Sequence, residues 1–363
     1  MKYIAAVACI VALVFMGGCG VFSAHAVGGS FPAPNDPEYA RQWALRPPDV
    51  EPFAQPYTRI DEAWSLVPPQ AGKVRVAVLD SGFDMDHPDL AANINSDLAW
   101  NVSDDNDDVS VTPGYAASAH GTHVAGIFGA VTDNGVGVAG VAYNHAEIVP
   151  IKTSRVRTLP DGSKDLLPSV RDTAKGIDKA VELGCRIINI SNGTYMDYDH
   201  PESAMLEKAV NDAVNAGAVV VSGAGNGLTD VTMYPSDYDA TVSVAATTRE
   251  GEHAIYSDTN AYKDIAAPGG GSDQRYGRCS YIYSTVPDGY GEKKGTSMAA
   301  PFVTGVAALM MAANPDITGE EVKSIIYGTA TDLGVPGRDD EFGYGLVNAA
   351  ESVRQAIAMK RKR

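Results

Sequence analysis

Short apolar runs and amphipathic stretches alternate along the middle of the chain. Runs rich in β-branched residues predict strands over residues 74–80, 146–152, 186–191 and 218–225. Apolar residues at helical spacing predict helices over residues 123–131, 169–184, 204–217, 298–315 and 318–330. Strands that are continuous apolar runs are buried on both faces. The pattern therefore predicts a single α/β domain, in which a mostly parallel sheet is covered by helices on both faces.

The first residues have the composition of an export signal. Met1-Lys2 is followed by an apolar stretch over residues 3–16, which is too short to span a bilayer but suits a signal peptide. Met16-Gly17-Gly18-Cys19 resembles a bacterial lipobox. We therefore expect a signal peptide over residues 1–18, a lipid anchor on Cys19 and a lipoprotein at the bacterial outer membrane or cell surface. Cleavage after Ala26, at an A-x-A site farther from the apolar stretch, is the alternative and would give a secreted protein.

The remainder divides into a Pro- and Gly-rich segment and one folded domain. Residues 19–56 suit a tether and an N-terminal arm, residues 57–357 carry the alternating strands and helices, and residues 358–363 form a basic tail. Hydrophobic residues make up 45% of the 363-residue chain, which suffices for a globular core and excludes a disordered protein. The formal net charge of −17 argues against a nucleic acid partner, because the phosphate backbone repels carboxylates.

The four cysteines do not form a disulfide framework. Cys9 and Cys19 belong to the export segment, so only Cys185 and Cys279 lie in the folded domain. These two form one bridge or remain thiols, and sequence positions alone do not show whether their Cα atoms come within bonding distance. The sequence contains no C-x-x-C spacing typical of a metal site.

Three motifs carry candidate catalytic residues. Asp80 ends the strand 74–80, at the edge of a parallel sheet where ligand sites form, although a turn aspartate is the simpler alternative. His120 begins HGTHVAG, in which His123 follows at a spacing that does not match a helical zinc pair. Ser297 lies where GTSMAAP enters a helix, whose N-terminal partial charge would favour both a nucleophile and an oxyanion; a plain helix cap is the alternative.

Taken together, these motifs resemble those of the subtilisin-like serine peptidases, with DSG, HGTHVAG and GTSMAAP in the same order along the chain. The resemblance covers roughly residues 34–357. It implies a serine endopeptidase in which Ser297 attacks the peptide carbonyl, His120 transfers the proton and Asp80 orients the imidazole. It also implies that Asn226, in VVVSGAGNG, donates to the oxyanion, and that His123 is a packed structural residue.

The same resemblance implies that polypeptide substrates bind as an extended strand between two segments of the chain. One segment is expected at residues 150–154 and the other at Ser191-Asn192-Gly193, where Asn192 replaces the leucine common in the family. Gly223, Ala224 and Gly225 are expected to form the opposite wall of the pocket for the residue before the scissile bond. Met233 is expected to reach the base of this pocket and shorten it, although methionine is also a common core residue.

A structural calcium ion is the cofactor that the resemblance implies. The segments NDPEYARQW, HPDL and AVTDNGVGVAG are similar to the strong calcium site of thermitase-like subtilisins. Carried over residue by residue, the ligands are side-chain oxygens of Asp36, Asp89 and Asn134 and main-chain carbonyls of Val131, Val136 and Val138. The acidic run 103–108 is similar to a weaker second site with Asp104 as a ligand; a solvated acidic loop is the alternative.

Two functional hypotheses follow. The leading one is an active serine endopeptidase that is exported and anchored to the cell envelope. The alternative is an inactive or partner-dependent peptide-binding subunit of an envelope protease complex, although the intact set Asp80, His120, Ser297 and Asn226 favours the first. The stretch between Cys19 and Asn35 is too short for the folding propeptide domain of most secreted subtilisins. We therefore expect that folding is assisted by a separate chain or needs no assistance.

Overall fold

The computed structural model describes residues 32–47, 57–159, 161–196, 198, 200–271 and 280–360. The expected signal peptide, Cys19 and the alternative cleavage site at Ala26 lie outside the described residues, as do most of the tether and the last three residues of the basic tail. Cys279 also lies outside them, so the possible bridge to the buried Cys185 is not tested. All described residues belong to the unit Phe31–Arg363.

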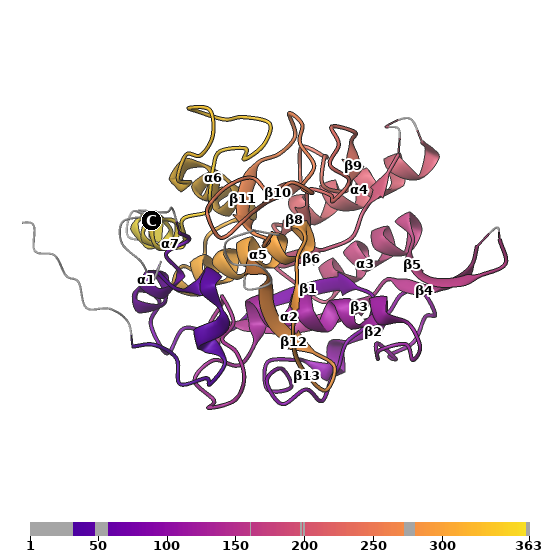
Figure 1. Cartoon of the computed structure of the whole chain (residues 1–363), viewed down its shortest axis with the longest axis horizontal. Coiled ribbons are helices and arrows are strands. Elements are labelled where there is room, and N and C mark those ends of the chain that lie inside the picture. Colours follow the sequence, from indigo (N-terminus) through magenta and orange to yellow (C-terminus); the bar gives the residue numbers. More distant parts are fainter. Residues whose placement is uncertain are drawn as a thin grey trace, which may run out of the picture. The chain divides into compact units, whose positions relative to one another are not determined.

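A seven-stranded sheet carries the fold, with the strand order β11-β10-β8-β6-β1-β3-β2 (Figure 1). Its strands in chain order are β1 (Val74–Asp80), β2 (Trp100–Asn101), β3 (Ala146–Lys152), β6 (Ile187–Ile190), β8 (Val219–Gly223), β10 (Val242–Thr247) and β11 (Ile265–Pro268). Every neighbouring pair runs parallel. The residues of β6, β8, β10 and β11 are buried throughout, as continuous apolar runs require.

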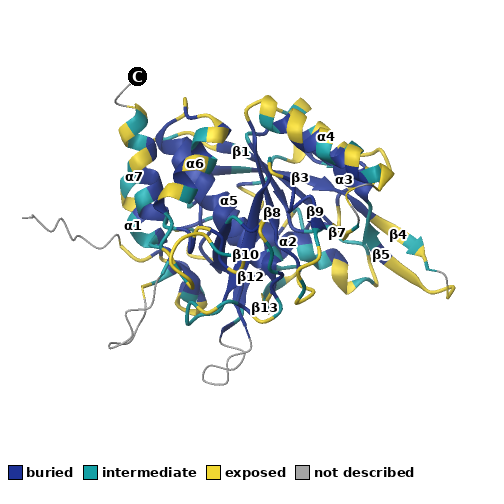
Figure 2. Ribbon diagram, turned by 90° about the horizontal axis from the view of Figure 1, so that it is seen from above, coloured by how far each residue is buried: buried dark blue, intermediate teal, exposed yellow. Residues whose placement is uncertain are grey.

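Helices cover both faces of this sheet (Figure 2). Val76 and Val78 of β1 belong to one core cluster, together with residues of α2 (His120–Gly129) and α5 (Thr296–Ala313). Ala77 and Leu79 point to the other face and pack with α3 (Val170–Glu182) and α4 (Pro201–Asn215). The first cluster also includes residues of α1 (Ile60–Leu66), α6 (Gly319–Thr329) and α7 (Ala349–Lys360). The predicted α/β class, with a parallel sheet between two helical layers, is confirmed.

The helix α5 carries the candidate nucleophile into the interior. Of the described helices, only α5 is long and apolar enough to cross a membrane, but 94% of it is buried inside the protein, so it serves as a core helix. Its small residues permit this packing, because a Cβ on Gly305 would lie 2.5 Å from Val141. The first turn of α5 touches the carboxyl end of β8, since a Cβ on Gly223 would lie 3.0 Å from Thr296.

Smaller elements surround the sheet. Three antiparallel pairs are β4 (Ser154–Thr158) with β5 (Lys164–Pro168), β7 (Thr194–Tyr195) with β9 (Met233–Tyr234), and β12 (Ile282–Val286) with β13 (Gly289–Lys293). Short 3-10 helices occur at Tyr39–Arg41, Trp43–Leu45, Ser96–Leu98 and Ala116–Ala119.

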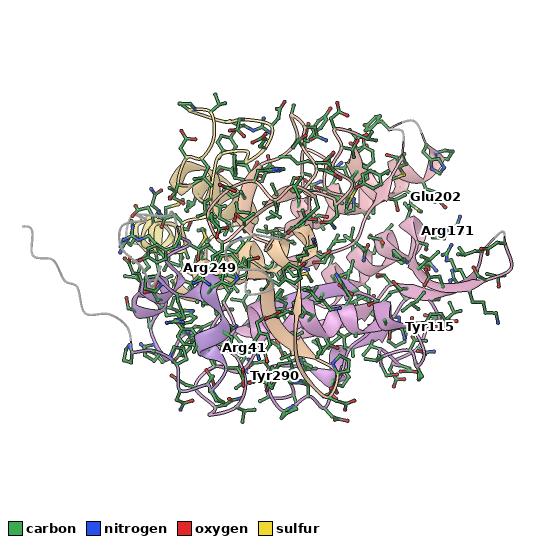
Figure 3. All side chains as sticks on the ribbon, viewed as in Figure 1. Arg41, Tyr115, Arg171, Glu202, Arg249 and Tyr290 are labelled. Atoms are coloured by element: carbon green, nitrogen blue, oxygen red, sulfur yellow. The ribbon has the colours of Figure 1, made fainter. Side chains whose placement is uncertain are left out.

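Several hydrogen bonds fasten the N-terminal arm, residues 32–47, to the domain, and those of Gln42 and Arg41 are among them. Gln42 exchanges two 2.8 Å hydrogen bonds with the backbone of Ala139. Arg41, which is labelled in Figure 3, places its guanidinium 3.7 Å above the ring of Tyr283 in β12 and donates to the Tyr283 hydroxyl at 2.7 Å. The arm therefore connects the loop before β3 with the hairpin that leads to Ser297.

Candidate active site

Asp80 and His120 meet at the carboxyl edge of the sheet. Asp80 is the last residue of β1, His120 is the first residue of α2, and His120 Nδ1 lies 2.9 Å from Oδ1 and 3.0 Å from Oδ2 of Asp80. The Asp80 side chain is 2% exposed, and the Ser81 backbone N–H and hydroxyl donate to its Oδ1 at 2.7 and 3.0 Å. The carboxylate therefore fixes the imidazole, and Nε2 is left without a hydrogen bond to any described residue.

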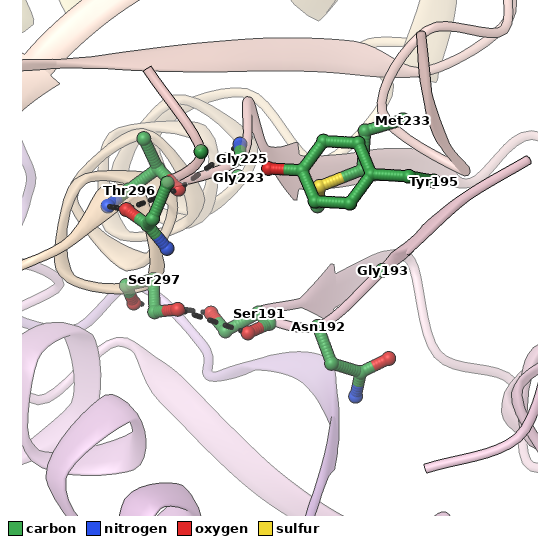
Figure 4. A pocket seen from close by; sticks show the side chains of 11 residues that line it. Ser191, Asn192, Gly193, Tyr195, Gly223, Gly225, Met233, Thr296 and Ser297 are labelled. Atoms are coloured by element: carbon green, nitrogen blue, oxygen red, sulfur yellow. Dashed lines mark hydrogen bonds between the residues drawn. The ribbon is translucent and has the colours of Figure 1, made fainter. Parts of the chain in front are cut away.

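Ser297 is the second residue of α5 and lies in its first turn. Its hydroxyl donates to the Ser191 carbonyl at 3.0 Å, and the Ser191 hydroxyl donates to the Ser297 carbonyl at 3.1 Å (Figure 4). No hydrogen bond between described residues joins Ser297 to His120 in this conformation. The Ser297 hydroxyl therefore has to leave the Ser191 carbonyl before it donates to His120 Nε2, and such catalytic bonds often tighten only when substrate binds.

Asn226 lies beside the same helix terminus. Its Oδ1 accepts hydrogen bonds from the backbone N–H of Thr296 at 2.9 Å and from the Thr296 hydroxyl at 3.2 Å. The amide Nδ2 donates to no described residue. The N–H groups of a first helical turn have no partner within the helix. Asn226 Nδ2 and the backbone N–H of Ser297 are thus two donors at one place, which is the arrangement that an oxyanion requires.

A pocket of about 280 Å³ opens beside Ser297 (Figure 4). Five of the predicted substrate-binding residues line it, namely Ser191, Asn192, Gly193, Gly223 and Gly225, and Met233 lines it as well. Ala224 is not a lining residue, because it is fully buried and packs with Ala245 and Ala266 on the far side of the wall. The Asn192 side chain donates to the Leu79 carbonyl at 3.3 Å, and in Figure 4 it points away from Met233.

The expectation that residues 150–154 form an edge for the substrate is wrong. Ile151 and Lys152 belong to β3, which pairs with β1 on one side and with β2 on the other, so their backbone groups are already used. Ser154 begins β4 and pairs with Pro168 of β5. The apolar run over residues 146–152 indicates that the strand is buried, but it does not indicate which strands lie beside it.

The three predicted side-chain calcium ligands come together next to the N-terminal arm. Asn134 Nδ2 donates to Asp89 Oδ1 at 2.8 Å, and the Asn134 backbone N–H donates to Asp36 Oδ1 at 3.2 Å. Asp36 and Asp89 are 4% and 0% exposed. Burial raises the pKa of Asp89 to about 6, with a further contribution from the Asp36 charge, and burial also raises the pKa of Asp36. These two buried carboxylates form no ion pair with a described Lys or Arg.

The main-chain oxygens around these side chains complete a possible cation site. The carbonyls of Val131, Val136 and Val138 accept no hydrogen bond from the described part of the chain. Buried carboxylates and unpaired carbonyls form an all-oxygen set, which is the chemistry that calcium prefers. Within the described residues, no group of three His, Cys, Asp or Glu side chains is arranged to hold a metal ion, and Asp104 belongs to no such group. The Asp104 carboxylate accepts a hydrogen bond from the Asn101 side chain at 3.1 Å. The second site at the acidic run stays a prediction.

Comparison with known proteins agrees with this geometry. The sequence profile described as the subtilase family matches residues 71–345. The chain belongs to this family. Thermitase of Thermoactinomyces vulgaris is 32% identical over 323 residues, which cover 88% of this chain and 99% of thermitase. Subtilisin of Bacillus pumilus is 34% identical over 280 residues, which cover 76% of this chain and 89% of the subtilisin.

A solved structure extends the similarity to the backbone. A protease of Pseudoalteromonas arctica superposes with a TM-score of 0.74 at 31% identity, covering 90% of this subtilase and 100% of that chain. The resemblance inferred from the three motifs is therefore confirmed, and the subtilase is a serine endopeptidase.

In this subtilase, the second histidine of HGTHVAG is structural. His123 is fully buried in α2, and its Nε2 lies 3.2 Å from the carbonyls of Ile282 and Gly291. Burial lowers the pKa of His123 to about 3, with smaller contributions from the charges of His120 and Lys293. A neutral imidazole therefore donates from Nε2 to the hairpin β12–β13, as expected for a packed residue.

Two residues near the pocket are missing from the sequence-based prediction. Tyr195 of β7 lines the pocket, and its hydroxyl donates to the buried Asp258 at 2.5 Å. No local pattern marks either residue, since Tyr195 follows the predicted segment and Asp258 lies 63 positions later in an irregular loop.

Proposed function

We propose that this subtilase hydrolyses peptide bonds of polypeptides through Ser297, His120 and Asp80. The hydrogen bonds from His120 Nδ1 to both oxygens of Asp80 carry the proposal. They hold the imidazole in the tautomer whose Nε2 is free to accept a proton. For this transfer the Ser297 hydroxyl leaves the Ser191 carbonyl, to which it donates at 3.0 Å, and donates to that nitrogen instead.

The chemistry proceeds through an acyl-enzyme. Ser297 Oγ adds to the carbonyl carbon of the scissile peptide while His120 Nε2 accepts the hydroxyl proton. His120 then donates this proton to the leaving amine as the C–N bond breaks. A water molecule attacks the ester, its proton passes to His120, and the ester bond breaks as the proton returns to Ser297. Asp80 stabilises the imidazolium that exists between these transfers.

The negative charge on the former carbonyl oxygen needs fixed donors. Asn226 Nδ2 and the Ser297 N–H fill this role, because Asn226 Oδ1 is held by Thr296 at the start of the same helix. The partial positive charge of the α5 N-terminus adds to the stabilisation.

Hydrolysis of an unfolded polypeptide tests the proposal. Purified enzyme is incubated with a reduced and alkylated protein substrate, and new peptide termini are identified by mass spectrometry. The wild type is expected to generate new termini and Ser297→Ala to generate none. Equal cleavage by both proteins would contradict the assignment of Ser297.

A structural calcium ion belongs to the proposal. Asp36, Asp89 and Asn134 would hold it, together with the main-chain oxygens of Val131, Val136 and Val138. The support is the all-oxygen donor set, which contains two buried carboxylates without a described cationic partner. The ion would neutralise these carboxylates and fasten the N-terminal arm to the domain, and it takes no part in the chemical step.

Export and anchoring complete the proposal. The apolar stretch over residues 3–16 and the lipobox-like Met16-Gly17-Gly18-Cys19 support a lipoprotein of the cell envelope. Membrane and soluble fractions of cells expressing the full chain provide the test. Wild-type protein is expected in the membrane fraction, and Cys19→Ala is expected to be released with altered mobility on a denaturing gel. If wild type and Cys19→Ala are both found in the soluble fraction, the result would favour cleavage after Ala26.

A further inference from the structure

The pocket beside Ser297 is closed at its far end by two side chains from facing strands. Tyr195 of β7 and Met233 of β9 are partners in the antiparallel register. Figure 4 shows the tyrosine ring and the methionine sulfur together at the end of the pocket opposite Ser297. We call these two side chains the pocket floor.

Met233 spans the pocket between glycines of opposite walls. A Cβ placed on Gly193 would lie 2.4 Å from Met233 Cε, and a Cβ placed on Gly225 would lie 2.8 Å from Met233 Sδ. The thioether thus contacts both walls at once. A substrate side chain that enters between the walls therefore meets Met233 instead of open space.

Tyr195 reinforces the floor from the side of the loop after β8. Its hydroxyl donates to Asp258 Oδ2 at 2.5 Å, and a Cβ on Gly227 would lie 2.7 Å from that hydroxyl. Asp258 is fully buried and also accepts from the backbone N–H groups of Gly227 at 2.8 Å and Thr229 at 3.1 Å. Because three donors fix this carboxylate, it serves as an anchor for the ring.

A buried ion pair supports the floor from behind. Lys263 Nζ lies 2.5 Å from Asp237 Oδ1, and both side chains are 0% exposed. Asp237 Oδ2 accepts from the Met233 backbone N–H at 3.0 Å, and the same lysine donates to the Ala224 carbonyl at 3.3 Å. The backbone of Met233 and the pocket wall that contains Ala224 are therefore both hydrogen-bonded to the same buried ion pair, Lys263 with Asp237. Displacement of the Met233 backbone would break a hydrogen bond to a buried charge, which is costly, so the strand that carries the floor is held in place.

We propose that the pocket floor makes this subtilase selective for substrates with a short, uncharged side chain before the scissile bond. This residue is called P1, and the inference rests on the proposed function of Ser297. None of the residues found to line the pocket carries a charge, so a charged P1 side chain has no partner there. An aromatic P1 side chain that reaches the floor has to displace Met233 or the anchored Tyr195, and overpacking of this kind costs about 10- to 100-fold in kcat/KM.

Two peptides that differ only at P1, alanine against phenylalanine, test the inference. The measured quantity is the ratio of their kcat/KM values. The wild type is expected to favour alanine by at least about 10-fold. Met233→Ala removes the thioether, and Tyr195→Ser removes the anchored ring; each is expected to shift the ratio toward phenylalanine by about 10-fold or more. Tyr195 is 44% exposed, so its replacement does not depend on repacking the core.

Matched replacements elsewhere separate the floor from general destabilisation. Met311→Ala truncates a buried methionine of α5 away from the pocket, and Tyr198→Ser removes an exposed tyrosine whose hydroxyl binds Glu207. Both controls are expected to keep the wild-type ratio. A wild type that favours phenylalanine, or a ratio unchanged in Met233→Ala and Tyr195→Ser, would overturn the inference.

A parallel reaction with a serine-reactive fluorophosphonate distinguishes a failure of the proposed function from a failure of the pocket-floor proposal. If the protein is folded but the reagent does not label Ser297, the proposed function is contradicted. A protein that is labelled on Ser297 but shows no preference for alanine contradicts only the pocket floor.

Discussion

Both carboxylate oxygens of Asp80 lie within hydrogen-bond distance of His120 Nδ1, at 2.9 and 3.0 Å. An asparagine at this position keeps the shape but presents an N–H group that favours the wrong imidazole tautomer. Asp80→Asn is therefore expected to lower kcat by about 10⁴-fold while the melting temperature stays close to wild type. Steady-state kinetics and a thermal scan measure both, and a loss below about 10-fold would contradict the assigned role of Asp80.

Asn226 offers a variant that separates its two functions. Asn226→Asp keeps an oxygen that accepts from Thr296, as Oδ1 does at 2.9 Å, but it removes the Nδ2 donor and adds charge. We expect kcat to fall by about 10²- to 10³-fold with little change in KM, because the donor acts on the transition state. Asn226→Ala should lose a similar factor. A substantial kcat in Asn226→Asp together with a low kcat in Asn226→Ala would assign the residue to positioning Thr296 instead.

Calcium is expected to raise the melting temperature. An ion that binds only the folded state at 100 times its Kd adds about 2.7 kcal/mol, which corresponds to roughly 4 °C for a domain of this size. Chelation with EDTA should reverse the increase. Asp89→Asn removes one buried carboxylate and should abolish the response, whereas Asp97→Asn, at an exposed aspartate, should retain it. If calcium does not change the melting temperature of the wild type, the proposed site is contradicted.

His123 makes stability depend on pH. The unfolded imidazole binds a proton below a pKa of 6.5, whereas burial lowers the pKa of folded His123 to about 3. The unfolded state therefore binds more protons between these values. The stabilising contribution is complete above about pH 6.5 and is lost as pH falls toward 3, at about 1.4 kcal/mol per pH unit.

Denaturant unfolding at pH 7 and pH 5 tests this linkage. The wild type should lose about 2 kcal/mol more than His123→Gln between the two values, because the variant lacks the titrating group. Equal losses in the two proteins would show that His123 does not stay neutral in the folded state.

Local pattern predicted the framework because burial on both faces forces continuous apolar runs. The strand expected over residues 74–80 is β1 (Val74–Asp80), and the strand expected over residues 146–152 is β3 (Ala146–Lys152). Strand neighbours are set by packing between distant segments, which such runs do not encode. The edge expected at residues 150–154 comes from the family resemblance, and it is wrong because β3 lies between β1 and β2.

The candidate site divides in the same way. Asp80, His120, Ser297 and Asn226 lie in short motifs, and the resemblance of these motifs to those of the subtilisin-like peptidases assigns them. The pocket floor depends on contacts over long separations, such as Tyr195 with Asp258 and Lys263 with Asp237. Charged residues are usually exposed, and a lysine and an aspartate 26 positions apart give no sign of a buried pair.

Intact-mass analysis after treatment with a serine-reactive fluorophosphonate tests the central claim most directly, because it requires an activated Ser297 but no knowledge of the substrate. The wild type and Ser297→Ala are treated in calcium buffer, and their folding is checked by circular dichroism. We predict a single adduct on the wild type and none on Ser297→Ala. A folded wild type that forms no adduct, or a Ser297→Ala variant that forms the same adduct, would contradict the account.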